Sequence, residues 1–284
     1  MDYKAYRESL SGGGHNVVLA EINELYHQFG GGVPKHVIGL RRFAHFAYAQ
    51  ASEKPDFLFL LGKGVREANE NIATGFGTRQ GALAYDACLI PTFGYPTSDN
   101  LITSKLDDNL WTPLIATGRL AAHTVEDVYA YLNKVQEYEL QQDPNSFYSV
   151  EDKLWQKEIL HFGGGANEVE QTIFKYYLES YETDLESAKF GGNISSYYKT
   201  VSDPVDPAIL TDVTDLIDNG VSLMTFFGHA SADGFDQNID DPENWNNTGK
   251  YPVVVGNACL TGNVFEPSSA VSYTHLTLPT KRIV

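Results

Sequence analysis

The chain has 284 residues, 42% of them hydrophobic, so it is long enough to bury one large core or two modest ones. Its 37 acidic and 20 basic residues give a net charge of −17, which argues against nucleic acid or an anionic membrane surface as a partner. No apolar run approaches the roughly 18 residues that a membrane-spanning helix needs.

Strand and helix patterns alternate along the first half of the chain. Short apolar runs predict strands, and apolar residues at helical spacing predict helices. Thr124 is the expected N-cap of a helix, with Asp127 at the capping-box position. The expected elements are a strand over 16–20, a helix over 37–50, strands over 57–61 and 114–117, and a helix over 124–139.

A polar segment with turn residues, 141–146, is the best candidate for a boundary between subdomains. A second alternating series follows it. The pattern predicts an α/β fold of parallel sheets with helices on both faces, in two subdomains. The expected elements of this series are strands over 158–162 and 195–200, helices over 167–180 and 207–219, and strands over 221–227 and 252–255.

The last two expected strands each lead to a residue capable of catalysis. Gly228-His229 follows the first, and Gly256-Asn257-Ala258-Cys259 follows the second. Ligands bind beyond the carboxyl ends of parallel strands, so His229 and Cys259 are expected side by side as base and nucleophile of a cysteine peptidase. Taken singly, a strand-end cysteine is usually a small buried hydrophobe, and a histidine is usually a hydrogen-bonded structural residue. The residues alone leave both interpretations open.

Small residues flank both groups, which leaves backbone N–H groups near the expected nucleophile. The N–H groups of Cys259 and of Gly228 or Ala230 are candidate oxyanion donors for the carbonyl oxygen under attack.

Residues 226–265, which contain both motifs, resemble the catalytic core of gingipain-type cysteine peptidases, a family of the caspase-like clan. In that family a Gly-His follows one strand and an Ala-Cys follows the next, with an acidic, Trp-containing loop between them. The type IX secretion sortase is among its relatives. Three upstream segments resemble the family as well, and the resemblance extends to about Ala270; these segments are 57–64, 89–99 and 115–120.

The resemblance implies a caspase-like fold, with an N-terminal subdomain over 1–145 and a catalytic subdomain over 146–270. It implies a cysteine-type endopeptidase, or a sortase-like transpeptidase, whose Cys259/His229 dyad cleaves peptide bonds in secreted or cell-surface proteins. Secretion-system or surface partners and a secreted or bacterial cell-surface location are expected with it. No cofactor is required by this chemistry.

Two positions depart from the family pattern. His123 stands where some members place an acid that orients the histidine, and Asn133 stands where arginine-cleaving members have an acid that selects basic side chains. The third catalytic residue and arginine specificity therefore do not carry over.

An acidic loop offers oxygen ligands for structural calcium, with Asp233, Asp236 and Asp240 as candidates. The loop lacks the EF-hand pattern, so a solvated loop is the favoured interpretation, and only the family, some of whose members bind calcium, adds weight to the metal. Cys88, inside an apolar stretch, is expected in the core.

Two other function classes remain open from the sequence. One is a non-catalytic caspase-like module that binds a protein partner in the same cleft. The other is a small-molecule enzyme that uses the glycine-rich turns 62–64 and 163–165, although neither turn matches a phosphate-binding spacing.

Both ends of the chain are unusual. Residues 271–284 resemble a translated sequencing adapter, so they are excluded from the fold prediction as an artefactual tail. The amino end lacks the apolar strand with which family members usually open. We therefore expect the chain to be a piece of a longer protein, cut at both ends.

Overall fold

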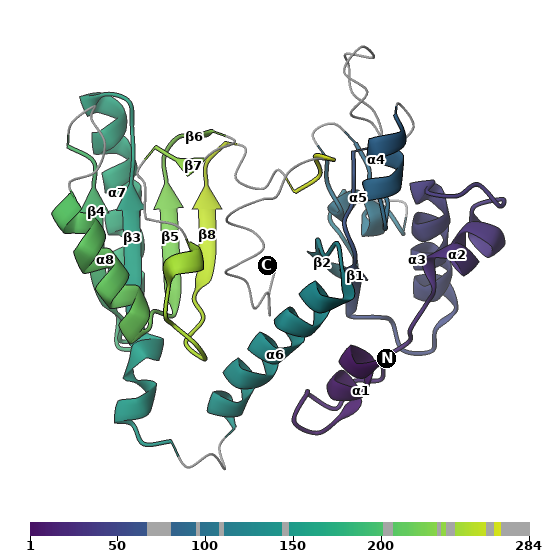
Figure 1. The fold of residues 1–284 in the computed structure, drawn as a ribbon, viewed down its shortest axis with the longest axis horizontal. Coiled ribbons are helices and arrows are strands. Elements are labelled where there is room, and N and C mark those ends of the chain that lie inside the picture. The colour runs from purple at the N-terminus through teal and green to yellow at the C-terminus, as the bar shows by residue number, and fades with distance from the viewer. Residues whose placement is uncertain are drawn as a thin grey trace. The chain divides into compact units, whose positions relative to one another are not determined.

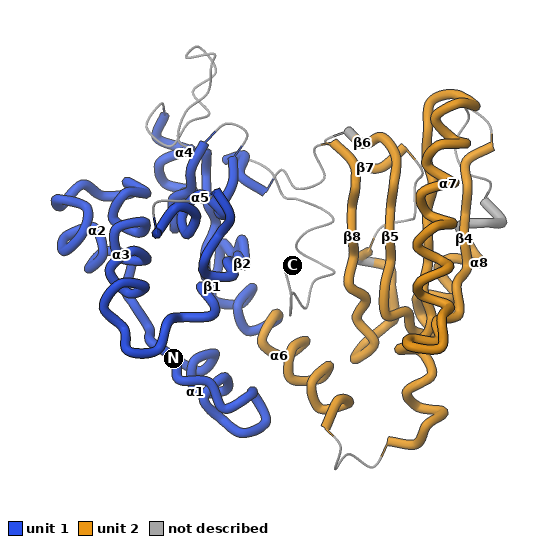
Figure 2. Tube along the Cα trace, turned by 180° about the vertical axis from the view of Figure 1, so that it is seen from behind, with its two compact units in different colours: residues 1–130, 264–270, 280–284 blue, residues 131–263, 271–279 orange. Residues whose placement is uncertain are grey.

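The computed structural model describes residues 1–66, 81–94, 97–107, 111–143, 148–200, 207–231, 234–236, 242–259 and 264–267. These residues form two compact units, shown in different colours in Figure 2. Unit 1 holds residues 1–130 and 264–267, and unit 2 holds the described residues from 131 to 259.

The boundary between the units falls inside one helix, α6 (Val125–Gln142), and not at the turn-rich segment after it. Tyr129, near the start of α6, donates a hydrogen bond to Asp2 of unit 1. The buried side chains of the helix begin at Tyr131 and belong to unit 2. Turn residues mark where a chain can change direction, whereas side-chain packing decides which unit a helical turn belongs to.

Unit 1 contains a pair of parallel strands, β1 (Phe57–Leu61) and β2 (Ala116–Leu120), whose register runs from Phe57↔Ala116 to Leu61↔Leu120. Its core gathers apolar side chains from helices and β1, including Leu40, Leu60 and Ile102. Cys88 is fully buried, as expected. The helices of this unit are α1 (Asp2–Glu8), α2 (Ile22–Phe29), α3 (Val37–Gln50), α4 (Ala82–Ala87) and α5 (Asn100–Thr103).

The strand expected over residues 16–20 does not form. The segment has no strand hydrogen bonds, and the Val18 side chain is 79% exposed. A short apolar run becomes a strand only where a neighbouring strand pairs with it and a core covers it. No strand pairs with this segment, and although Ala20 packs against the core, Val18 and Leu19 are exposed.

Arg119, near the end of β2, ties together the upstream segments that resemble the family. Its guanidinium forms two hydrogen bonds with the carboxylate of Asp99, at 2.7 and 2.8 Å. It also donates to the carbonyl oxygens of Gly62 and Ile90, at 2.7 and 2.9 Å. The Arg119 side chain is almost fully buried, so these contacts hold the three segments together inside unit 1.

Unit 2 is built on a four-stranded parallel sheet in the order β4-β3-β5-β8 (Figure 1). Its strands are β3 (Glu158–Gly163), β4 (Asn193–Tyr198), β5 (Leu223–Phe227) and β8 (Val253–Asn257). A two-stranded antiparallel ribbon of β6 (Ala230–Ser231) and β7 (Gly234–Phe235) follows β5. The helices are α7 (Glu168–Leu185), α8 (Pro207–Asn219) and the 3₁₀ turns η2 (Glu151–Lys157) and η3 (Pro242–Asn244).

Helices α7 and α8 cover opposite faces of this sheet. Successive strand side chains point to opposite faces. Met224 and Phe226 of β5 pack in the core with Ile217 of α8. Phe227, on the other face, stacks on Phe174 of α7 with 4.6 Å between ring centroids. The prediction of parallel strands with helices on both faces is confirmed.

Local sequence signals placed most of the element ends. Helices α3 and α8 match their predicted ranges. The capping box is present: Asp127 N–H donates to Thr124 Oγ1, and Thr124 N–H donates to Asp127 Oδ2, at 3.2 and 2.9 Å. Asn167 caps α7 by accepting from Glu170 N–H at 3.1 Å.

Candidate active site

His229 and Cys259 follow two strands that pair directly. The register of β5 and β8 ends at Phe227↔Asn257, and each candidate lies two residues beyond that pair. His229 contacts Phe174 and Glu170 of α7, so it lies on the sheet face that α7 covers, while Cys259 lies in the turn that follows β8. The prediction that these strands are neighbours is confirmed, and Cys259 is exposed at the end of its strand.

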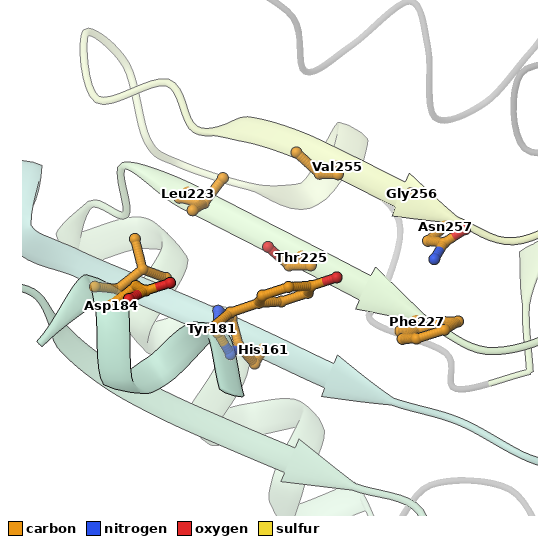
Figure 3. A pocket seen from close by; sticks show the side chains of 10 residues that line it. His161, Tyr181, Asp184, Leu223, Thr225, Phe227, Val255, Gly256 and Asn257 are labelled. Atoms are coloured by element: carbon orange, nitrogen blue, oxygen red, sulfur yellow. The ribbon is translucent and has the colours of Figure 1, made fainter. Parts of the chain in front are cut away.

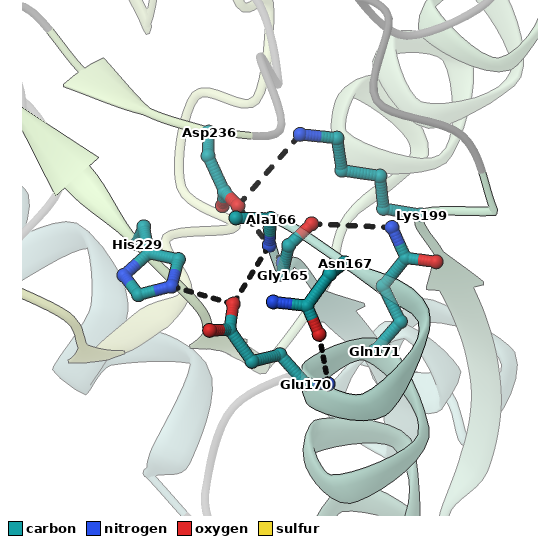
Figure 4. Close-up of polar contacts among 8 residues, drawn as sticks. All are labelled: Gly165, Ala166, Asn167, Glu170, Gln171, Lys199, His229 and Asp236. Atoms are coloured by element: carbon teal, nitrogen blue, oxygen red, sulfur yellow. Dashed lines mark hydrogen bonds and ion pairs between the residues drawn. The ribbon is translucent and has the colours of Figure 1, made fainter.

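The His229 ring is held by a carboxylate that the sequence did not single out. Nε2 of His229 lies 2.9 Å from Glu170 Oε2, as Figure 4 shows, and Phe174 contacts the ring edge-on at 6.0 Å between centroids. A carboxylate only accepts hydrogen bonds, so Nε2 carries the proton in this pair. Nδ1 is left to exchange a proton with another group.

Glu170 is fixed by the first turn of α7. Its Oε2 also accepts a hydrogen bond from Ala166 N–H at 2.9 Å, and its backbone N–H is held by the Asn167 cap. The Ala166 hydrogen bond, followed by the one from His229, lowers the pKa of the Glu170 carboxyl. The carboxylate is therefore ionised and oriented towards His229.

The sequence did carry a signal for this residue. Asn167-x-x-Glu170 is a capping-box spacing directly after the glycines that end β3, so it puts a carboxylate at the edge of the sheet where His229 lies. The position that the resemblance matched to an orienting acid is His123, which lies in unit 1 and whose backbone N–H donates to Asp127 Oδ2 at 2.8 Å.

The candidate oxyanion donors are only partly available in this conformation. Gly228 N–H donates to the Asn257 carbonyl oxygen at a long 3.4 Å, which continues the β5–β8 ladder by one step. Ala230 pairs with Phe235 in the ribbon. The roles of Gly228, Ala230 and Cys259 N–H stay predictions.

Of the three calcium candidates, Asp236 is the one that lies within the described residues. Asp233 and Asp240 lie outside the described residues. Asp236 accepts a hydrogen bond from Gly165 N–H at 2.9 Å and has the Lys199 ammonium 3.9 Å from the same oxygen. Within the described ranges, no group of three or more His, Cys, Asp or Glu side chains could hold a metal ion.

A pocket of about 540 Å³ opens on the sheet face that α7 covers, the face on which His229 lies (Figure 3). At its near end are Phe227 and Asn257, each two residues before a candidate catalytic residue. Thr225 and Val255 come next along the strands, and Tyr181 of α7 lies across from them. The walls are mostly apolar, with hydroxyl and amide groups among them.

His161 of β3 forms part of the pocket wall and is fully buried. Neither ring nitrogen has a hydrogen-bond partner in the described part of the chain, and Glu182 lies 3.8 Å from Nδ1. Burial lowers the pKa of this imidazole, against the smaller opposing effect of Glu182. The pocket therefore presents a neutral histidine. Asn133, the position matched to a specificity acid, is exposed on α6 and does not line this pocket.

Comparisons with known proteins identify the family and the fold of the chain. The model of peptidase family C25 matches residues 1–280. The crystal structure of the Arg-specific cysteine proteinase gingipain R (RgpB) aligns over 80% of this chain and 45% of its own, at 16% identity and a TM-score of 0.53.

The complex of the pro- and mature domains of Porphyromonas gingivalis RgpB aligns over 93% of this chain and 53% of that one, at 14% identity and a TM-score of 0.60. The chain thus spans about half the length of these structures. No curated protein sequence matches it. Together, the family match over residues 1–280 and the shared caspase-like α/β fold show that the chain belongs to peptidase family C25, the gingipain family of cysteine peptidases.

Proposed function

We propose that this protein is a cysteine endopeptidase in which Cys259 is the nucleophile and His229 is the general acid and base. The observation that carries the proposal is the His229–Glu170 hydrogen bond of 2.9 Å at the ends of the paired strands β5 and β8. A nucleophile, a base and a group that orients the base are the parts that covalent catalysis needs.

The reaction follows from this arrangement. Glu170 holds the proton on His229 Nε2, so Nδ1 takes the thiol proton and Cys259 attacks as thiolate. A bond forms between Sγ and the substrate carbonyl carbon, and Nδ1 returns its proton to the leaving amine as the C–N bond breaks. Water, deprotonated by His229, then hydrolyses the thioester and releases the Cys259 thiol. In a sortase-like transpeptidase an amine would take the place of that water.

The developing oxyanion needs donors beside the cysteine. We propose the Cys259 N–H as the first donor, with Gly228 or Ala230 N–H as the second. Because Gly228 N–H makes only a long hydrogen bond to Asn257, a small shift of this turn would release it to the substrate.

The pocket supports a preference for a large uncharged side chain before the cleaved bond. Its near end is formed by Phe227 and Asn257, which precede His229 and Cys259 by two residues each. The lining also includes an acidic residue, Asp184 of α7. A side chain that enters the pocket at this near end therefore meets an aromatic ring and a neutral amide first.

The catalytic assignment is tested with a peptidyl acyloxymethyl ketone, which alkylates an activated cysteine. We expect labelling of the parent chain and no labelling of Cys259→Ala. The matched control is Cys88→Ala, because the Cys88 thiol is buried in unit 1 and should not react. Intact-mass spectrometry would locate the adduct.

Equal labelling of Cys259→Ala and the parent would overturn the assignment. A parent chain that is folded, reacts with iodoacetamide at Cys259 and ignores every peptidyl probe would favour the alternative, a non-catalytic caspase-like module that binds protein partners.

Specificity is tested with three probes that differ only in the residue before the warhead: phenylalanine, arginine and aspartate. The phenylalanine probe should label fastest, because the near end of the pocket presents the Phe227 ring and the neutral Asn257 amide. Faster labelling by the arginine probe would show that specificity is set elsewhere, while leaving the peptidase assignment intact.

Location and partners follow the family rather than the geometry. We propose a secreted or bacterial cell-surface protein that acts on polypeptide substrates, in a type IX secretion setting. Among the helices that the structure describes, none has the length and apolar character to cross a membrane. No step of the proposed reaction requires a cofactor, and structural calcium stays a prediction.

A further inference from the structure

The acidic loop after His229 contributes a carboxylate to the active site, and that carboxylate belongs to Asp236. The ribbon of β6 and β7 turns the chain back after His229, so that Asp236 N–H donates to the His229 carbonyl oxygen at 2.9 Å. The backbone of Asp236 is therefore locked to the backbone of the proposed base.

The side chain of Asp236 reaches a different segment. Its Oδ2 accepts a hydrogen bond from Gly165 N–H at 2.9 Å, in the turn that joins β3 to α7. The next residue of that turn, Ala166, donates to Glu170, and Glu170 binds His229. Figure 4 shows the side-chain contacts, and the backbone bond between Asp236 and His229 completes a ring in which Asp236 is the second link between the histidine and the carboxylate that orients it.

Two glycines make the space for this carboxylate. A Cβ on Gly164 would lie 2.2 Å from Asp236 Oδ1, and a Cβ on Gly228 would lie 2.8 Å from the same atom. At both distances the Asp236 carboxylate would have to move to admit a side chain. The fit shows that the turn and the strand end are shaped around Asp236.

The charge of Asp236 is balanced nearby. Lys199, just past β4, places its ammonium 3.9 Å from Oδ2, and both side chains are largely buried. A positive charge at this position disfavours a second cation on the same oxygen. This contact supports an anchoring role for Asp236 over a metal-ligand role.

We propose that Asp236 is a positioning residue that fixes His229 against Glu170 by joining the β6–β7 ribbon to the Gly163–Gly165 turn. It does not touch the substrate. This inference rests on the proposed role of His229 as the catalytic base.

The test reads the His229 ring directly, by ¹⁵N NMR of histidine-labelled protein, with His229→Gln used to assign the signal. The parent should show one fixed tautomer protonated at Nε2. Asp236→Ala should give a mixture of tautomers and slow probe labelling at Cys259 about 10- to 100-fold, the scale of loss from a misplaced catalytic group.

Two variants separate positioning from general stability. Asp236→Asn keeps an oxygen that can accept from Gly165 N–H, so it should retain the fixed tautomer. Asp215→Ala removes an exposed acid from α8 in the same unit and should change nothing. If Asp236→Ala does not fold, Asp236→Ser, whose hydroxyl is too short to reach Gly165, replaces it with the same expected result.

A coupling experiment gives an independent check. Gly164→Ala should mimic Asp236→Ala, because its Cβ displaces the carboxylate, and it should have little further effect when Asp236 is already alanine. The proposal would be overturned if folded Asp236→Ala kept the tautomer of the parent. It would also be overturned if the effects of Gly164→Ala and Asp236→Ala on the tautomer and on probe labelling were fully additive. Failure of the parent to react with any peptidyl probe would overturn the peptidase function alone, since the NMR result does not depend on activity.

Discussion

Glu170 Oε2 accepts two hydrogen bonds, one from Ala166 N–H within its own helix turn and one from the His229 ring. The hydrogen bond from Ala166 fixes the carboxylate to the backbone. The hydrogen bond with His229 sets the tautomer of the imidazole. Both bonds need the ionised form of the carboxyl group, so they act in the same direction on its pKa.

The pKa of Glu170 should therefore lie below its ordinary value of 4.5 in the folded protein. A carboxyl whose pKa is lowered by folding stabilises the fold above its unfolded pKa, and that contribution is lost as the pH falls through the lower folded value. Titration of the Glu170 carboxyl carbon by ¹³C NMR would measure this.

The variant His229→Gln provides the control for that titration. The midpoint should rise but remain below 4.5, because the Ala166 N–H, the larger cause of the lowered pKa, is still present. A midpoint at or above 4.5 in the parent would contradict the observed contacts.

At the scale of elements, the strand ends of both units are followed by glycine-rich turns, and those turns differ in use. The turn after β3 holds Asp236 and the start of α7, next to the candidate catalytic pair. The turn after β1, Gly62-Lys63-Gly64, is built into the core of unit 1: Lys63 N–H donates to the Ala122 carbonyl oxygen, and the Lys63 carbonyl oxygen accepts from Ile90 N–H. Neither turn needs a nucleotide to explain its glycines.

Lys63, in the turn after β1, is fully buried, and its Nζ has no hydrogen-bond partner within the described ranges. Burial lowers its pKa to about 8, partly opposed by Glu266. Between about pH 8 and the ordinary value of 10.5, the unfolded chain binds more protons than the folded one, so the free energy of unfolding rises with pH.

Lys63→Met should consequently be more stable than the parent at pH 7, by about 1–3 kcal/mol, and the difference should shrink towards pH 10. Urea unfolding at a series of pH values measures this, with Lys189→Met, an exposed lysine in unit 2, as the control. A Lys63→Met variant that is less stable than the parent at pH 7 would show that the ammonium has a partner that stabilises it.

At the scale of the whole molecule, the motifs of the chain separate into two groups. The upstream segments that resemble the family meet around Arg119 in unit 1, where they form a buried structural network. The His and Cys motifs, together with Glu170 and Asp236, all belong to unit 2. Each proposed chemical role can therefore be tested against the geometry of one unit.

The sequence by itself determined the strands and helices with strong periodicity, the parallel α/β class and the candidates His229 and Cys259. These are local properties: an apolar run, a cap, or a residue just past a strand end. It failed for residues 16–20, where the apolar run was present but no partner strand paired with it.

Only the tertiary structure decided which groups surround His229. Glu170 precedes it by 59 residues, and Asp236 reaches the Gly165 turn across 71 positions of sequence. The sequence shows Glu170 at a capping-box position and Asp236 in an acidic loop. It does not show that both residues contact His229. Such contacts depend on how α7 and the β6–β7 ribbon return to one end of the sheet, and that return is set by packing across the whole unit rather than by any local pattern.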